Sequence, residues 1–201
     1  SENRTNQRTL VVHSEDVDYI KFFPNSYTVT KRKEIPADFH TDIFYKGIKD
    51  IKNGSYNCIL CTGLLEHVPE PQKLIDDFYR ILKPNGKLII SASAVFSIHE
   101  GPNDFFHFTH YSFISLFKKW NNYDFIRGSS LPFETIGILL NRILIQCDIF
   151  PPIRPFVELL SLIIPYLDKF IYQQHDCVGY KSESRKIDSM LPSNIQAVFY
   201  K

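Results

Sequence analysis

The segment 56–90 constrains the fold of this chain more than any other part of the sequence. It opens with an apolar run at 57–61 of the kind found in strands that are buried on both faces. After a loop, Pro71 stands where the first turn of a helix tolerates a residue without an N–H group. The pattern predicts a strand, a helix and a second strand, with a turn at 84–86 before the second strand.

The predicted helix, 71–82, carries large apolar residues on one face, which favours burial against a sheet. These residues are Leu74, Ile75, Phe78, Ile81 and Leu82. A strand–helix–strand unit predicts parallel strands that are joined by a right-handed crossover. Because ligands of such sheets bind outside the carboxyl ends of the strands, we expect functional residues just after Cys61 and just after Ser91.

Weaker patterns complete the predicted sheet on both sides of this unit. Further strands are predicted at 9–12, 27–30, 87–92, 123–127 and 194–200, and short helices at 17–23 and 111–120. Residues 38–44 are predicted to be a short strand or an extended loop. A chain of 201 residues can bury a sizeable core, and we expect one domain over 1–201.

Composition narrows the classes of partner and compartment. The 23 basic and 22 acidic residues nearly cancel, so nucleic acid is not an expected partner. No basic and apolar leader opens the chain, so we expect no secretory signal and a cytoplasmic protein. Residues three apart in a strand point to opposite faces, so Cys58 and Cys61 are not expected to share a metal.

The composition changes over 131–172, where only seven residues carry a formal charge. Two helices are predicted, near 134–147 and 155–171, and neither has the ~20 unbroken apolar residues of a membrane-spanning helix. One interpretation is a C-terminal helical insertion that forms a lid on the sheet. The other is an apolar surface that contacts a membrane peripherally, a lipid-like substrate or a second copy in a homodimer.

The run from Cys61 to Ser91, CTGLLEHVPEPQKLIDDFYRILKPNGKLIIS, closely resembles class I S-adenosylmethionine-dependent methyltransferases. Residues 98–109, IHEGPNDFFHFT, are similar to a segment of a subgroup that is frequent among sugar and polysaccharide biosynthesis enzymes. The resemblance implies a Rossmann-like α/β fold with a mostly parallel sheet, helices on both faces and an antiparallel final strand. It also implies S-adenosylmethionine as the cofactor.

The cofactor site that this resemblance implies departs from the family pattern. The family has a glycine-rich loop after its first strand, whereas the corresponding segment here, 10–19, contains no glycine. Lys31 stands where the family places an acidic residue for the ribose hydroxyl groups. The residues that the resemblance assigns to the cofactor are His13, Ser14, Glu15, Asp42, Thr62, Gly63, Leu64 and His67.

The resemblance also assigns candidate catalytic residues to the loop after the fifth predicted strand. His99 and Asp104 match family positions and are the leading candidate pair, whereas His107 stands where the family often has arginine, which leaves its role open. Histidine suits a general base near neutral pH, although these side chains could instead hold the loop by hydrogen bonds. In some relatives a Glu-x-x-Glu-His arrangement binds a metal ion, but Gly63 replaces the first Glu, so no metal site is expected.

Three kinds of function follow from this comparison of residues. The first is O-methylation of a sugar or another small hydroxylated acceptor. The second is a catalytically inactive homologue that acts as a binding or scaffolding protein in a glycan or lipid-linked pathway. The third is a peripheral membrane protein that uses segment 131–172. Binding of S-adenosylmethionine distinguishes the first from the second, and binding to lipid vesicles identifies the third.

Overall fold

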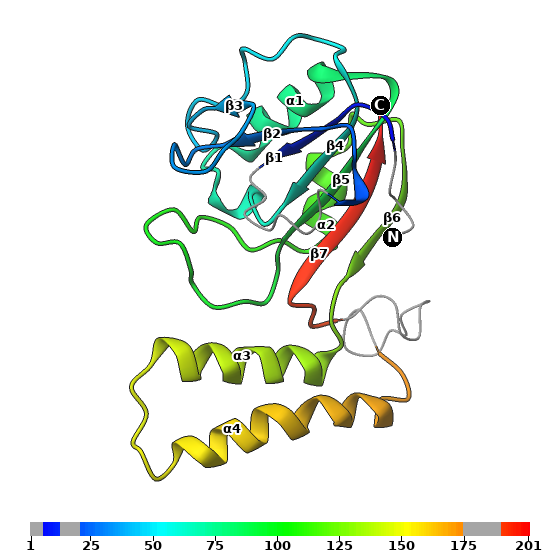
Figure 1. Cartoon of the computed structure of the whole chain (residues 1–201). Coiled ribbons are helices and arrows are strands. Elements are labelled where there is room, and N and C mark those ends of the chain that lie inside the picture. Colours follow the sequence, from blue (N-terminus) through cyan, green and yellow to red (C-terminus); the bar gives the residue numbers. More distant parts are fainter. Residues whose placement is uncertain (1–5, 13–20, 175–189) are drawn as a thin grey trace. The chain divides into compact units, whose positions relative to one another are not determined.

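The structure is a computed structural model of the chain, and it describes residues 6–12, 21–174 and 190–201 (Figure 1). The chain forms two compact units, each of which is described by itself. The first comprises Ser1–Ala92, Glu100–Ile126 and Gln196–Lys201, and the second comprises Ser93–His99 and Arg127–Ile195. The organisation as a single domain stays a prediction.

The described residues form a seven-stranded sheet with the strand order β3-β2-β1-β4-β5-β7-β6. The strands are β1 (Thr9–Val12), β2 (Ser26–Thr30), β3 (Phe39–His40), β4 (Tyr56–Thr62), β5 (Leu82–Ser93), β6 (Asn122–Gly128) and β7 (Asn194–Tyr200). Strands β1 to β5 pair in parallel. Lys201 bonds to Asn85 and Gly86 while Ser193 bonds to Ala94, so β7 runs antiparallel to β5. The predicted mostly parallel sheet with an antiparallel final strand is confirmed.

The central strands are buried on both faces. Val11 of β1 pairs with Leu60 of β4, and their side chains pack with Phe22 and Phe23 on one side of the sheet. Cys58 lies in the same cluster, and the alternation along a strand therefore turns Cys61 to the other face.

Helix α1 (Pro71–Ile81) is amphipathic as predicted, and its apolar residues are buried: Leu74, Ile75, Phe78 and Ile81. Helix α2 (His110–Leu116) begins at Thr109, whose side chain accepts a hydrogen bond from the Ser112 N–H. Tyr79 of α1 lies edge-on to Trp120 at 5.3 Å between ring centroids, and Phe117 stacks on Phe199 of β7 at 4.0 Å. Aromatic packing thus joins both helices to the antiparallel end of the sheet.

Several predicted boundaries were wrong. Residues 84–86 do not form a turn before β5 but an irregularity within it, because Tyr56 pairs with Leu82 and Cys58 pairs with Lys87. Of segment 38–44, predicted as a short strand or an extended loop, only Phe39–His40 forms a strand, since the Tyr45 and Lys46 N–H groups bond to the Asp42 carbonyl and turn the chain. Most of the predicted helix 17–23 lies outside the described residues.

The second unit contains the helical hairpin α3 (Pro132–Gln146) and α4 (Arg154–Ile163), which continues as the 3-10 helix η3 (Ile164–Phe170) (Figure 1). The Asp168 carboxylate accepts hydrogen bonds from the Phe133 and Glu134 N–H groups at 2.9 and 2.7 Å. It therefore caps α3 from 34 residues away in the sequence. Over the described part of the chain, no helix has the length and apolar character needed to cross a membrane.

Candidate functional site

The carboxyl end of β4 presents an open stretch of backbone. Gly63 directly follows the strand with a φ of 57°, a conformation that favours glycine, and its N–H group donates to the Ser91 carbonyl of β5 at 3.1 Å. A Cβ atom added to Gly63 would meet no described atom within 4 Å. Gly63 is exposed between the half-buried Thr62 and the fully buried Leu64, so its backbone is accessible at the edge where parallel sheets bind ligands.

The short 3-10 helix η2 (Leu65–His67) holds the loop that follows β5. The Glu66 carbonyl accepts hydrogen bonds from the Phe105 and Phe106 N–H groups at 2.9 and 3.2 Å. The buried His67 ring places Nδ1 3.0 Å from the Asn103 carbonyl oxygen. Because a carbonyl only accepts, the proton of His67 in this bond is on Nδ1. His67 therefore positions a loop segment that carries predicted catalytic residues.

Asn103 is a positioning residue that sequence reasoning missed. Besides the bond to His67, its side-chain oxygen accepts a hydrogen bond from the Tyr45 hydroxyl at 3.0 Å. A hydrogen bond through a backbone carbonyl cannot be predicted from the residue type. Asn103 does lie within segment 98–109, next to Asp104, which the resemblance assigned to the active site.

Asp104 and His107, three residues apart in the sequence, have side chains that lie close together. His107 Nε2 lies 3.6 Å from the Asp104 carboxylate, whose side chain is only 3% exposed, while His107 is 33% exposed. This distance is that of an ion pair and exceeds that of a hydrogen bond, so Asp104 can stabilise a positive charge on the partly exposed imidazole of His107.

His99 is placed within the second unit. Its Nδ1 atom lies 3.1 Å from the Ser97 carbonyl, and its ring lies edge-on to Phe96 at 5.1 Å. The Arg142 guanidinium also lies over Phe96 and donates to the Ser97 hydroxyl at 2.9 Å. The predicted pairing of His99 with Asp104 stays a prediction.

The carboxyl end of β2 carries a cation, as the sequence indicated. The Lys31 ammonium group lies 3.7 Å from the centroid of the Phe44 ring, and the His67 ring lies 5.9 Å from the same ring. The predicted adenine contact, Asp42, is exposed in the turn after β3. His13, Ser14 and Glu15 lie outside the described residues.

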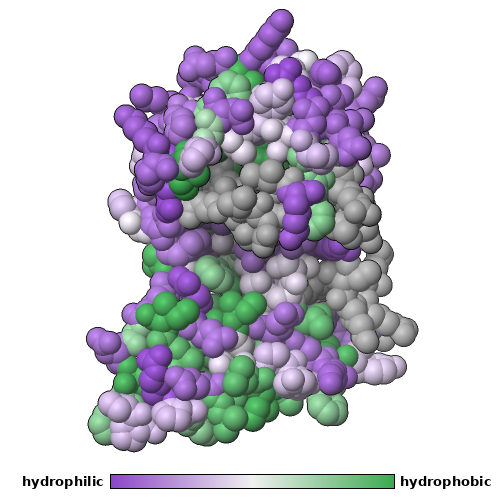
Figure 2. All heavy atoms as spheres, viewed as in Figure 1, coloured by the Kyte–Doolittle hydropathy of each residue, from purple (hydrophilic) through white to green (hydrophobic). Residues whose placement is uncertain are grey.

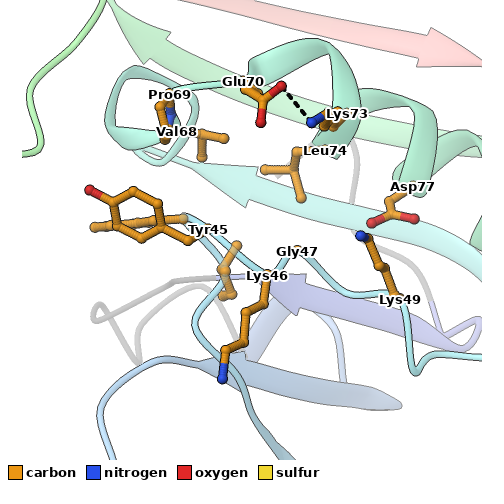
Figure 3. Close-up of a pocket in the computed structure, with 12 residues that line it drawn as sticks. Tyr45, Lys46, Gly47, Lys49, Val68, Pro69, Glu70, Lys73, Leu74 and Asp77 are labelled. Atoms are coloured by element: carbon orange, nitrogen blue, oxygen red, sulfur yellow. Dashed lines mark ion pairs between the residues drawn. The ribbon is translucent and has the colours of Figure 1, made fainter.

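A small pocket lies between α1 and the loop 43–49 (Figure 3). Lys73 and Glu70 form an ion pair at its rim at 2.5 Å, and Lys49 points toward Asp77. Its volume of about 100 Å³ is below the ~300–1,000 Å³ of typical small-molecule sites. It contains neither Asp104 nor His107, so we do not assign the cofactor or the acceptor to it.

The two cysteines of β4, Cys58 and Cys61, are free and buried. Burial raises the pKa of the Cys58 thiol to about 11 and also raises that of Cys61. Since thiolates are the reactive and metal-binding form, burial makes both thiols poor nucleophiles and poor metal ligands.

Comparison with known proteins decides the family. A family model described as a methyltransferase domain matches residues 5–135 of this chain. The chain belongs to the methyltransferase domain family. It is 31% identical over 78 residues to a ubiquinone biosynthesis O-methyltransferase of Xanthomonas oryzae, a match that covers 37% of this chain and 33% of the relative. A protein of the same name from Xylella fastidiosa is 28% identical, with coverage of 37% and 32%. The alignment thus spans about a third of these relatives.

Solved structures agree on the fold. A methyltransferase from Archaeoglobus fulgidus, titled as S-adenosylmethionine-dependent, superposes with a TM-score of 0.59 at 11% identity and covers 98% of this chain and 87% of its own. The [4+2]-cyclase SpnF superposes with a TM-score of 0.56 at 11% identity, covering 100% of this chain and 76% of its own. A methyltransferase and a cyclase share this fold, so the reaction must be argued from the site.

Proposed function

We propose that this protein transfers a methyl group from S-adenosylmethionine to an oxygen atom of a small hydroxylated acceptor. The observation that carries the proposal is the pair of Asp104 and His107, held on a loop that is bonded to η2 after β4. Membership of the methyltransferase domain family supports the reaction class. The local similarity to ubiquinone O-methyltransferases supports oxygen as the acceptor atom.

In this proposal the cofactor binds at the carboxyl ends of β4 and β3, where two features support it. The open backbone of Gly63 lets a ligand approach without collision, and Asp42 offers a carboxylate to an adenine amino group. Lys31 departs from the family pattern because an ammonium group donates and does not accept, so it would bond to ribose oxygens as a donor. S-adenosylmethionine supplies, when bound, a methyl group on a cationic sulfur atom.

In this proposal two side chains of the protein, those of His107 and Asp104, assist removal of the proton from the acceptor hydroxyl. As the acceptor hydroxyl loses its proton, the imidazole of His107 takes it and becomes positively charged. The buried carboxylate of Asp104, 3.6 Å away, stabilises that charge. The fractional exposure of His107 leaves its ring open to an acceptor, whereas Asp104 is closed off from water.

The sugar acceptor that the segment 98–109 implies belongs to this proposal as its preferred substrate class. A catalytically inactive homologue is the second candidate, and the cation at the end of β2 favours it, since Lys31 removes the usual acceptor for the ribose. Such a protein would not bind the demethylated product S-adenosylhomocysteine.

The test combines binding and turnover in one pair of matched variants. His107→Gln should lower kcat for methyl transfer to a panel of monosaccharides and catechols by at least about 100-fold, since general bases contribute ~10²–10⁴-fold. Its affinity for S-adenosylhomocysteine should stay unchanged. His110→Gln, the same change three residues on, is the control and should leave both quantities within about twofold. Full turnover of His107→Gln would contradict the assignment of the base.

A further inference from the structure

Helix α4 exposes a continuous row of large apolar side chains. Phe156, Leu159, Leu160 and Ile163 recur at helical spacing and are 66, 54, 36 and 51% exposed. We call these four residues the α4 stripe. In Figure 2, hydrophobic side chains gather over the part of the chain that forms the hairpin, whereas hydrophilic ones dominate elsewhere on the visible face.

The hairpin places small residues inside and large apolar residues outside. Gly137 of α3 packs so closely on the next helix that an added Cβ would lie 2.8 Å from Pro165 and 3.0 Å from the Ser161 carbonyl. Ser161 is 4% exposed, and on a helical wheel it lies across α4 from the stripe. A surface helix of a globular protein normally turns its apolar stripe toward the core, whereas the α4 stripe is exposed.

The apolar surface continues beyond the stripe at both ends of α4. Phe150 and Ile153 are exposed in the connection between α3 and α4, next to two prolines. Tyr166 and Phe170 of η3 are exposed at the other end. Aromatic side chains at both ends of an apolar helix are typical of segments that lie at a membrane–water interface.

Six of the seven charged side chains of segment 131–172 have a partner within this unit, including Lys169 over the Tyr166 ring, whereas Asp148 is exposed in the connection between α3 and α4. Arg154 pairs with Glu158 at 2.9 Å, the Asp168 carboxylate caps α3, and the Arg142 guanidinium bonds to a serine hydroxyl. Glu134 accepts a bond from the main chain at the start of α3. The four residues of the α4 stripe carry no charge, so the stripe itself can leave water without burying an uncompensated charge.

The sign of these charges also bears on the occupant. Segment 131–172 carries three basic and four acidic residues, Arg142, Arg154 and Lys169 against Glu134, Asp148, Glu158 and Asp168. Polybasic attraction to anionic lipids therefore cannot supply the binding energy. The nearly balanced charges therefore favour a partner surface without net charge, and binding by insertion of apolar side chains into that surface.

We infer that the α4 stripe docks on the interface of a zwitterionic lipid bilayer, with α4 lying along the surface. This surface would hold the protein where membrane-bound or lipid-linked acceptors occur, and it does not depend on the methyl-transfer reaction. Burial of the stripe in the acyl–headgroup boundary supplies the attraction.

The experiment is flotation with phosphatidylcholine vesicles, with and without about 0.5 M salt. The wild-type protein should bind the vesicles at millimolar lipid in both conditions. Leu159→Ser with Ile163→Ser should lower the partition coefficient at least about tenfold, which follows from the value of burying such side chains. The control is Tyr111→Ser with Ile114→Ser on α2, which are 61 and 45% exposed, and it should change binding less than about twofold.

Three outcomes would overturn the inference. One is failure of the wild-type protein to float, and another is equal loss in the stripe and control variants. The third is a wild-type dimer in sedimentation equilibrium that becomes monomeric in the stripe variant without any vesicle binding, which would assign the stripe to a second copy. Thermal unfolding followed by circular dichroism verifies that both double variants fold.

Discussion

Arg80 of α1 should be a major anchor of the loop that leads from Asp42 to β4. Its guanidinium donates to the carbonyl oxygens of Ile51 and Ile48 at 2.6 and 3.1 Å, and to the Asn53 side chain at 2.6 Å. A further bond of 3.1 Å reaches Asp77. Replacing Arg80 with methionine keeps much of the apolar stem and removes every one of these donors.

The size of the effect follows from the burial of the loop. Ile48 and Ile51 are 2 and 8% exposed, so the loop cannot swing out to hydrate its carbonyl groups without uncovering the core. Hydrogen bonds from charged donors contribute about 1.5–3 kcal/mol each when buried. Arg80 is 28% exposed, which places its bonds at the low end. We expect Arg80→Met to lower the free energy of unfolding by about 2–4 kcal/mol.

Urea unfolding followed by circular dichroism measures this loss. The matched control on the same helix is Lys73→Met, which breaks an ion pair whose side chains are 72 and 63% exposed. Exposed pairs contribute about 0–1 kcal/mol, so the control should change little. If the two variants lose the same free energy within about 0.5 kcal/mol, the anchoring role of Arg80 is refuted.

Two further predictions concern titrating groups. In a Cys177→Ser background, a thiol reagent should modify the exposed Cys147 in the folded protein. It should reach Cys58 and Cys61 only on unfolding, because both are buried. Equal labelling rates at all three cysteines would contradict this. The hydrogen bond from Tyr200 to Asp124, together with burial, raises the pKa of the Tyr200 hydroxyl from 10.0 to about 12. Its stabilising contribution is therefore complete below pH 10 and is lost as pH rises through about 12, because the unfolded chain releases this proton first. The difference in unfolding free energy between wild type and Tyr200→Phe should shrink over that range, and a constant difference would count against the bond.

Helices and strands with a clear pattern of apolar residues and a clear start signal were predicted well from the sequence. The apolar face and the leading proline of α1 define that helix within one residue, and the apolar run of β4 defines that strand. The irregularity at 84–86 escaped prediction because proline, asparagine and glycine suit a turn and a bulge equally. Only the pairing of β4 with β5 distinguishes the two.

The resemblance pointed to the loop that carries the candidate catalytic residues, but it favoured His99 as the partner of Asp104. The 3.6 Å contact between Asp104 and His107, three residues apart, was not predicted. Bonds that join distant segments left no pattern to detect, such as those from Arg80 to a loop about 30 residues earlier or from His67 to the Asn103 main chain. Long-range anchoring of this kind depends on packing, which a single sequence does not display.

The central claim is that the carboxyl end of β4 forms part of a site for S-adenosylmethionine. Its most direct test is calorimetric titration with S-adenosylhomocysteine of the wild-type protein and of two glycine variants. Gly63 and Gly54 both have a φ of 57° and open space at the Cβ position, so Gly54→Ala controls for the backbone strain of Gly63→Ala. We predict micromolar binding that Gly63→Ala weakens at least about tenfold more than Gly54→Ala. The absence of binding to the wild-type protein at millimolar ligand would contradict the account.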